Sequence, residues 1–478
     1  MLECDLCVIG SGPAGQRAAI QAAKLRKRVV VVEDAPFVGG GAIRNGTIPS
    51  KALREAILRS LGRVSATPRA EDFLIGRNAR FADLLESAHA VVEAESRVVQ
   101  QHFSSNGIQV ELGRGRFEGA DRVVVEKAAA RRNGDIERVE IRASNVVVAV
   151  GTRPARPTNI AFDGRNIITS DELLELDYLP HSMIVVGGGV IGTEYASMLA
   201  ALGVRVTLVE GRARLLDFVD TEIIEALQYH LRQAGVTLRL GEKVVSIRTV
   251  DPPPGARSVN AQMAEATLES GKTLRADCLL YAVGRQGSTD DLGLEHAGLA
   301  ADDRGRIAVD ENFRTKVEHI YACGDVVGFP ALASTSMEQG RRAACAMFGE
   351  KVEQAEELLP YGIYSIPEIS MVGWTEERLT AEGIPYEAGI AQYKEIARGQ
   401  LLGDEIGMLK MLIHQDSHAV LGVHAIGTGA TELIHIGQAA IAFRATVEYF
   451  VNTVFNYPTL AECYKVAAYN GLNKLKNV

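Results

Sequence analysis

Gly10-Ser11-Gly12-Pro13-Ala14-Gly15 follows an apolar run at residues 2–9 and precedes an alanine-rich stretch that extends to about Leu25. Residues 28–33 then contain four consecutive valines and end in Glu33, roughly 20 residues after the first glycine. This order predicts a strand, a glycine turn, a helix and a second strand. The first glycine permits the tight turn, the second lets a diphosphate approach the backbone, and the third lets helix and strand pack closely.

The start of this helix and the acidic residue together predict a dinucleotide-binding site. Unpaired N–H groups and the positive end of the helix dipole face an anion at the start of the helix. Glu33, at the end of the second strand, can accept hydrogen bonds from the ribose of an adenosine.

A second copy of the same pattern begins at Met183. A strand at residues 183–186 leads into Gly187-Gly188-Gly189-Val190-Ile191-Gly192, and a helix through Leu202 precedes a strand at residues 204–210 that ends in Glu210. Two complete units predict two dinucleotide sites, as in flavoproteins that take electrons from a nicotinamide.

The residues after the second acid carry a mixed signal. Glu210 suits NAD, because an acid there binds the ribose 2′-hydroxyl. Arg212 and Arg214 follow at once, and guanidinium groups there could accept the 2′-phosphate of NADP, although they could also be solvated loop residues. A site that tolerates both NAD and NADP fits this combination.

Bulk properties of the 478 residues exclude several classes of protein. The net charge is −9 and no long basic run occurs, which argues against a nucleic-acid partner. No apolar stretch reaches the roughly 18 residues that span a bilayer, and the first strand begins within a few residues of Met1, so a cytoplasmic protein without membrane partner or leader is expected.

The six cysteines are irregularly spaced, so no disulfide framework is expected. Cys4 and Cys7 are predicted to pack on opposite faces of a strand.

The segment Gly39-Gly40-Gly41-Ala42-Ile43-Arg44-Asn45-Gly46-Thr47-Ile48-Pro49-Ser50-Lys51 resembles the active-site segment of the flavoprotein disulfide reductases. Members of that family carry a redox cysteine pair beside the flavin, and here the two cysteine positions hold Ala42 and Thr47. The glycines and Pro49 predict a loop that enters a helix at about Ser50, with Ser50 as a possible N-cap.

The resemblance implies an α/β fold with two Rossmann-like dinucleotide-binding domains and a C-terminal α+β dimerisation domain. The expected segments are an FAD-binding domain in two parts, an NAD(P)-binding domain and an interface domain that forms a homodimer. Their bounds are 1–155 and 285–352 for FAD, 156–284 for NAD(P) and 353–478 for the interface.

The resemblance also assigns binding residues to the two cofactors, and no metal site is expected. The residues implied for FAD are Gly10, Gly12, Gly15, Glu33, Gly41, Thr47, Lys51, Gly151, Asp325 and Ala333, with Asp325 accepting hydrogen bonds from the ribityl chain. The residues implied for NAD or NADP are Gly187, Gly189, Gly192, Glu194, Glu210, Arg212 and Gly284.

Lys51 and Glu194 are the catalytic candidates that the resemblance implies. In the family this lysine lies near the flavin and pairs with a glutamate of the second dinucleotide-binding helix. A lysine charge there would stabilise the reduced flavin. The alternative is an ordinary structural ion pair.

The C-terminal end shows a further departure from the disulfide-using members. Their acid/base histidine is replaced here by Tyr457, while the glutamate that orients it remains as Glu462. Tyrosine, with a reference pKa near 10, is a poor base at neutral pH. Because Ala42, Thr47 and Tyr457 together remove the disulfide and its base, the sequence indicates a flavoenzyme whose chemistry ends at the flavin.

Within the family, the chain resembles the soluble pyridine nucleotide transhydrogenases over essentially its whole length. Matching segments include residues 46–53, 364–370 and 448–459, whereas Ala42 stands where those proteins keep a lone cysteine. The resemblance implies hydride transfer between NADPH/NADP⁺ and NADH/NAD⁺ through FAD. The alternatives are an NAD(P)H-dependent reductase of quinones or other acceptors and a flavin-binding sensor or scaffold, against which the second nucleotide unit argues.

Overall fold

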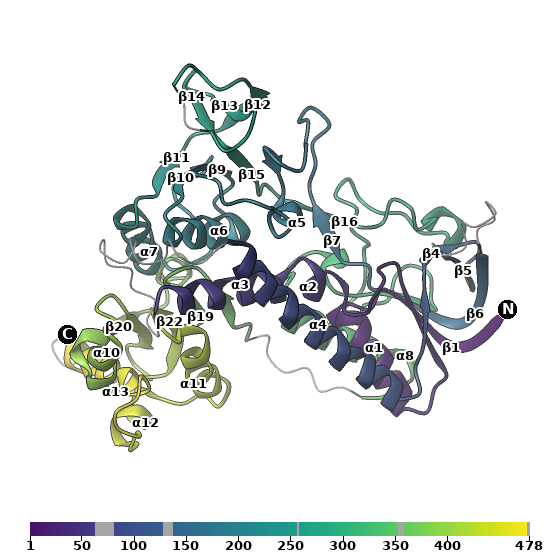
Figure 1. Cartoon of the computed structure of the whole chain (residues 1–478). Helices are drawn as coiled ribbons and strands as arrows, with labels where there is room; N and C mark the ends of the chain where they lie inside the picture. The colour runs from purple at the N-terminus through teal and green to yellow at the C-terminus, as the bar shows by residue number, and fades with distance from the viewer. Residues whose placement is uncertain (63–80, 128–136, 256–257, 352–357, 476–478) are drawn as a thin grey trace. The chain divides into compact units, whose positions relative to one another are not determined.

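The computed structural model describes residues 1–62, 81–127, 137–255, 258–351 and 358–475 (Figure 1). These residues form two compact units. The first unit comprises Met1–Ala52, Leu85–Ala155 and Gly284–Gln354, and the second comprises Leu53–Leu84, Arg156–Val283 and Ala355–Val478. The predicted domain boundary at 352/353 lies outside the described residues. No helix in these ranges is long and apolar enough to cross a membrane.

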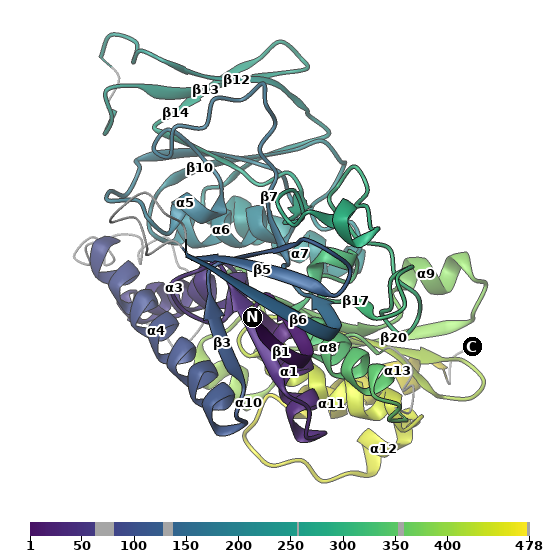
Figure 2. The ribbon, with the colours of Figure 1, turned by 90° about the vertical axis from the view of Figure 1, so that its right-hand side faces the viewer.

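A seven-stranded sheet organises the described part of the first unit, with β1, β6 and β5 side by side in Figure 2. The strand order is β3-β2-β1-β6-β5-β4, and β17 also pairs with β6. Strands β1, β2, β3 and β17 run parallel to their neighbours, whereas β4 and β5 are antiparallel. The bounds are β1 Leu2–Ile9, β2 Val29–Glu33, β3 Gln109–Leu112, β4 Arg114–Phe117, β5 Arg122–Lys127, β6 Glu137–Val148 and β17 Ile320–Ala322.

Apolar side chains cover both faces of this sheet. On one face, β1 and β2 pack with helices α1 (Pro13–Lys24), α4 (Phe81–Ser105) and α8 (Ala333–Met347). Helices α1 and α8 lie side by side (Figure 1). Their backbones can approach closely because Gly340 has no side chain: an ideal Cβ there would lie 2.0 Å from the Ala14 carbonyl oxygen. On the other face, side chains of β1, β2 and β6 form a second apolar cluster with those of β4 and β5, at the end of the same sheet, and of the short helix η4 (Leu294–Ala297). A two-stranded antiparallel ribbon of β7 (Thr152–Pro154) and β16 (Arg285–Gly287) completes this unit together with the one-turn helix η5 (Asp325–Val327).

The second unit contains a parallel sheet of order β11-β10-β9-β15-β8 and a small antiparallel sheet of β12, β13 and β14. Helix α6 (Val190–Ala201) follows β9 and is almost entirely buried, whereas α7 (Thr221–Gln233) follows β10 and is amphipathic. The remaining bounds are β8 Ile167–Ile168, α5 Ser170–Leu173, β9 Ser182–Val186, β10 Arg205–Glu210, β11 Thr237–Leu240, β12 Val244–Val250, β13 Met263–Leu268, β14 Thr273–Ala276 and β15 Cys278–Tyr281.

The C-terminal part of the second unit is an antiparallel sheet of order β18-β19-β22-β21-β20. Its core joins β21, β22 and the helices α11 and α13. The bounds are β18 Tyr361–Ile363, β19 Ile369–Gly373, α9 Glu376–Ala381, β20 Tyr386–Gln392, η6 Tyr393–Glu395, α10 Ala397–Leu402, β21 Met408–His414, β22 Val420–Ile426, α11 Ala430–Ala442, α12 Val447–Asn452 and α13 Glu462–Leu475. A mixed sheet and a parallel sheet, each with helices, together with a C-terminal antiparallel sheet confirm the predicted fold class.

The helix predicted to start at about Ser50 begins earlier. Helix α3 spans Thr47–Ser60, and a short helix α2 occupies Gly40–Arg44, where a loop was expected. Pro49 fits in the first turn of α3 because the first N–H groups of a helix have no intrahelical partner. The Ser50 hydroxyl donates a hydrogen bond to the Thr47 carbonyl at 3.2 Å and therefore does not cap the helix.

The two cysteines of β1 are packing residues, but the prediction that they face opposite sides of the strand is wrong. Cys4 and Cys7 are both buried in the same core cluster. The N–H groups of Asp5 and Leu6 both donate to the Arg28 carbonyl, at 3.0 and 3.2 Å, so the regular alternation is interrupted between the two cysteines.

Candidate functional site

The first glycine turn adopts the conformation that its sequence predicts. Gly10 has φ +104°, and an ideal Cβ there would lie 2.4 Å from the Ala149 carbonyl oxygen. A Cβ at Gly15 would lie 1.9 Å from the Gly10 carbonyl oxygen, so α1 packs on the turn without room for a side chain. Gly12 instead faces open space: its nearest neighbour would be the Gly40 Cα at 3.9 Å, and no side chain caps α1. An open, uncapped helix start fits the diphosphate of a dinucleotide.

Glu33 lies buried at the end of β2, beside this turn. One of its carboxylate oxygens accepts hydrogen bonds from the Ser11 N–H at 3.0 Å and the Ser11 hydroxyl at 2.5 Å, and the other accepts from the Ala35 N–H at 3.0 Å. Burial raises the pKa of Glu33, and the Ser11 hydroxyl partly opposes that shift. A carboxylate can accept about four hydrogen bonds, so one acceptor position is left for a ribose hydroxyl.

The segment that begins at Gly39 packs directly on the glycine turn. The Gly39 N–H donates to the Ser11 hydroxyl at 2.7 Å, and an ideal Cβ at Gly40 would lie 2.5 Å from the Gly12 Cα. The structure thereby brings Gly41 at the start of α2 and Thr47 at the start of α3 into the same unit as Gly12.

Asp325 follows β17 at the same edge of the sheet as the glycine turn, because β1, β6 and β17 are adjacent and parallel. Its carboxylate accepts hydrogen bonds from the Thr152 hydroxyl at 3.3 Å and from the Ser336 hydroxyl at 3.4 Å. Gly151, with φ +65°, precedes this threonine, and Ala333 begins the helix α8 that carries the serine. The structure therefore places Asp325 between the residue that follows Gly151 and the helix that begins at Ala333, and their role in binding FAD stays a prediction.

The second glycine turn repeats the geometry of the first. Gly187 has φ +107°, with an ideal Cβ 2.7 Å from the Ala282 carbonyl oxygen, and a Cβ at Gly192 would lie 1.9 Å from the Gly187 carbonyl oxygen. No atom lies within 4 Å of an ideal Cβ at Gly189, which precedes α6 without a side-chain cap. The two openings at Gly12 and Gly189 are therefore equivalent, and both fit a dinucleotide diphosphate.

Glu210, at the end of β10, forms a close pair with Arg212. One carboxylate oxygen accepts from the Gly188 N–H at 2.6 Å and from Arg212 Nη2 at 3.1 Å, and the other accepts from Arg212 N and Nε at 2.8 and 3.0 Å. Burial would raise the pKa of Glu210, but the hydrogen bonds from Arg212 outweigh it and the pKa is lowered. Arg212 Nη1 also donates to Asp217 at 2.6 Å. Glu210, predicted to bind the ribose, and Arg212, predicted to bind a 2′-phosphate, thus form an ion pair with each other.

Glu194 is buried in α6, where its Oε1 accepts a hydrogen bond from the Tyr364 N–H at 2.8 Å. Lys51 belongs to the other unit, and its Nζ donates to the Ser50 hydroxyl at 3.3 Å. The pairing of Lys51 with Glu194 stays a prediction. Gly284, which has φ +83°, falls in the first unit, where its carbonyl accepts a hydrogen bond from the Ala155 N–H at 3.2 Å.

None of the six cysteines forms a disulfide. All are buried, and burial is the first cause of a raised pKa for each thiol, to about 11 for Cys4 and about 12 for Cys323. Tyr457 is 70% exposed, and the buried Oε2 of Glu462 accepts no hydrogen bond from the described residues.

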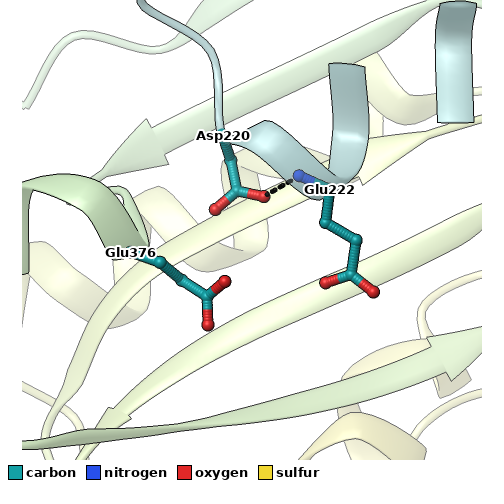
Figure 3. A group of neighbouring side chains, drawn as sticks. All are labelled: Asp220, Glu222 and Glu376. Atoms are coloured by element: carbon teal, nitrogen blue, oxygen red, sulfur yellow. Dashed lines mark hydrogen bonds between the residues drawn. The ribbon is translucent and has the colours of Figure 1, made fainter. Parts of the chain in front are cut away.

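Sequence reasoning missed a buried ionic cluster in the second unit. Lys410 of β21 is fully buried, and its ammonium lies 2.9 Å from Asp220, 3.0 Å from Glu222 and 2.7 Å from Glu376. The three carboxylates converge on one point (Figure 3). A lysine within the apolar stretch Met408–His414 was the available signal, because lysine is almost never fully buried unless paired.

Comparison with known proteins agrees with this geometry. A family model for the pyridine nucleotide-disulphide oxidoreductases matches residues 4–340, and one for their dimerisation domain matches residues 359–468. The chain is 48% identical over 476 residues to the soluble pyridine nucleotide transhydrogenase of Mycobacterium tuberculosis, covering 100% of this chain and 98% of the relative. It is 45% identical over 476 residues to the protein of the same name from Yersinia enterocolitica, with 98% of each chain covered.

Two solved structures share the fold. The HOCl-induced flavoprotein disulfide reductase RclA from Escherichia coli superimposes with a TM-score of 0.83 at 25% identity, covering 96% of this chain and 98% of RclA. LpdA from Mycobacterium tuberculosis superimposes with a TM-score of 0.81 at 27% identity, covering 98% of this chain and 99% of LpdA. FAD and NAD(P) are the cofactors of such proteins. From the glycine turns, the matched family models and the full-length relatives it follows that this chain belongs to the pyridine nucleotide-disulphide oxidoreductase family.

Proposed function

We propose that the chain is an FAD-dependent transhydrogenase that moves a hydride between NADPH/NADP⁺ and NADH/NAD⁺ without a redox disulfide. The observation that carries the proposal is the combination of two intact dinucleotide turns with Ala42 and Thr47 at the positions of the cysteine pair. The buried thiols elsewhere support it, because a raised thiol pKa leaves little thiolate at neutral pH. The names of the relatives from Mycobacterium and Yersinia agree with it.

FAD, when bound, would supply the chemistry of hydride transfer between one nicotinamide nucleotide and another. Around it, the open start of α1 at Gly12 holds the diphosphate, and Glu33 accepts hydrogen bonds from the adenosine ribose. Asp325 holds the ribityl chain, and Gly41, Thr47, Gly151 and Ala333 line the approach to the flavin.

The other unit binds the nicotinamide nucleotides in turn. Gly187, Gly189 and Gly192 form the turn that binds the diphosphate. Glu210 accepts a hydrogen bond from the 2′-hydroxyl of NAD. When NADP binds, Arg212 exchanges its hydrogen bonds to Glu210 for hydrogen bonds to the 2′-phosphate. Lys51 and Glu194 act at the flavin as a charge pair. Gly284 lies where the chain passes from the NAD(P)-binding domain back to the FAD-binding domain.

The chain acts as a cytoplasmic homodimer in this proposal. The matched dimerisation model at residues 359–468 supports self-association. So do the exposed apolar side chains at the C-terminal end, where Tyr449 is 52%, Val454 92% and Tyr457 70% exposed.

Anaerobic reduction of the flavoprotein tests the proposed reaction. One equivalent of NADPH should bleach the flavin absorbance, and added NAD⁺ should restore it with stoichiometric NADH. No long-wavelength thiolate–flavin band should appear during reduction, because Ala42 and Thr47 supply no thiol. A reduced flavin that transfers no hydride to NAD⁺ but is reoxidised by a quinone would instead identify a reductase of quinones or other acceptors. Turnover of a dithiol substrate would contradict both functions.

Replacement of Arg212 by alanine should shift the nucleotide preference toward NAD. Loss of a charge-assisted bond to the 2′-phosphate should lower kcat/KM for NADPH about 10- to 100-fold, whereas that for NADH should change about threefold or less. Steady-state kinetics with each nucleotide as donor measures the ratio. Arg205→Ala removes an exposed arginine from the other end of β10 and is the matched control. Equal losses for NADPH and NADH would contradict the assignment.

A further inference from the structure

The segment 211–220, which joins β10 to α7, connects the ribose site with the C-terminal part of the second unit. We call it the ribose segment. At its start, Arg212 pairs with Glu210. In its middle, Leu216 is fully buried and its N–H donates to the Gly188 carbonyl at 3.2 Å. Its last residue, Asp220, caps α7 by accepting a hydrogen bond from the Glu222 N–H at 3.2 Å. The segment therefore contacts the second glycine turn and ends at a capped helix.

Glu377 of α9 holds Thr221, the residue that directly follows the ribose segment. Its Oε1 accepts hydrogen bonds from the Thr221 N–H at 3.0 Å and from the Thr221 hydroxyl, and lies 3.6 Å from Arg214 Nη1. Burial would raise the pKa of Glu377, but the hydrogen bonds from Thr221 outweigh it and lower the pKa to about 2, so the group is ionised at neutral pH.

Arg214 continues this connection toward the ribose site. Its Nη1 donates to the Thr221 hydroxyl, and its Nη2 donates to the Asp217 carbonyl at 2.8 Å. The Asp217 carboxylate in turn accepts from Arg212 Nη1 at 2.6 Å. An unbroken series of polar contacts thus runs from α9 to the arginine that pairs with Glu210.

Lys410 fixes the same end of the segment from β21. Its ammonium contacts both carboxylate oxygens of Asp220, at 2.9 and 3.1 Å, as well as Glu222 and Glu376. The three carboxylates in Figure 3 resemble the ligands of a divalent cation. The Lys410 ammonium, however, already lies 2.7 to 3.0 Å from each of them. Because Lys410 and Asp220 are both fully buried, separating them would leave uncompensated charge, so Lys410 holds Asp220 at the end of the segment.

We propose that Glu377, with Lys410, positions the ribose segment and thereby sets the affinity of the second nucleotide site for a 2′-phosphate. The inference rests on the proposed function, because it takes residues 187–212 as the site of the nicotinamide nucleotides. Its physical basis is that Glu210 belongs to strand β10 and accepts a hydrogen bond from the Gly188 N–H, so two anchors of Glu210 remain when the far end of the segment moves. Arg212 and Arg214 are held by the segment itself. Loosening the far end should therefore weaken recognition of the phosphate and spare recognition of the hydroxyl.

The test compares two small probes on the FAD-loaded enzyme by calorimetry. The probe 2′,5′-ADP carries the 2′-phosphate, and 5′-AMP carries the 2′-hydroxyl. In Glu377→Gln the dissociation constant for 2′,5′-ADP should rise about five- to tenfold, which corresponds to losing half or more of the binding free energy of one charge-assisted hydrogen bond. The dissociation constant for 5′-AMP should change about twofold or less. The KM for NADPH should rise in parallel with kcat unchanged. Glu382→Gln, at the exposed C-terminal end of the same helix, is the matched control.

A pair of conservative variants separates positioning from general stability. Thr221→Val removes the hydroxyl that links Arg214 to Glu377 and should behave as Glu377→Gln, whereas Thr221→Ser keeps the hydroxyl and should restore wild-type binding of 2′,5′-ADP. Unchanged affinities in Glu377→Gln, or equal weakening of both probes, would overturn the positioning role. Failure of the unaltered enzyme to bind either probe would refute the proposed nucleotide site instead.

Discussion

Gly189→Val should leave the fold and the bound FAD intact and lower kcat/KM for NADPH and NADH alike by about 100-fold or more. The backbone at this position has φ −77° and ψ −171°, which valine adopts readily, and no atom lies within 4 Å of an ideal Cβ. The new side chain would occupy the space where the diphosphate meets the start of α6. Two lost charge-assisted hydrogen bonds account for a factor of this size.

Three measurements make this expectation specific. The flavin absorbance spectrum and the thermal unfolding midpoint should match those of the unaltered enzyme, while stopped-flow reduction by NADPH should fail. Gly192→Ala provides the contrast, because its Cβ would lie 1.9 Å from the Gly187 carbonyl oxygen and should destabilise the protein itself. Normal reduction of the Gly189→Val flavin by NADPH would show that the diphosphate does not lie at α6.

Lys410→Met should lower the free energy of unfolding of the second unit by about 3–5 kcal/mol, the usual cost of removing one partner from a buried ion pair. The variant leaves Asp220, Glu222 and Glu376 facing one another without a cation. Trp374, the single tryptophan of the chain, offers a local probe, because its carbonyl accepts a hydrogen bond at 2.9 Å from His424, the cross-strand neighbour of Lys410.

Urea unfolding followed by tryptophan fluorescence measures this loss. Lys394→Met, at an exposed position in the same part of the chain, should change the midpoint little. Lys410→Met combined with Glu376→Gln should recover part of the stability, because one of the uncompensated charges is removed. An equal midpoint for Lys410→Met and Lys394→Met would show that the buried ammonium contributes nothing to stability.

The elements that bind nucleotides could be predicted well, because their requirements are local. The positive φ of Gly10 and Gly187 and the carbonyl contacts at Gly15 and Gly192 exclude any side chain. An acid at the end of the next parallel strand necessarily lies beside such a turn, as Glu33 and Glu210 do.

The predictions that failed depended on contacts that sequence spacing does not report. The start of α3 moved from Ser50 to Thr47, because Pro49 is tolerated in a first helical turn. The alternation of β1 was interrupted between Cys4 and Cys7 by the carbonyl of Arg28, the residue before strand β2. Arg28 lies more than 20 residues along the chain from either cysteine, so their spacing does not report this contact.

The sequence by itself determined the two dinucleotide turns, their acids and the family, since each follows from residues near one another in the chain. Only the tertiary structure decided that Arg212 pairs with Glu210 and Asp217, and that Lys410 meets Asp220 across 190 residues of sequence. The physical reason is that the sequence offers each charged side chain many residues of opposite charge, and only the packing of the folded chain determines which of them it contacts. Local backbone geometry is encoded locally, whereas the pairing of charges is settled by packing.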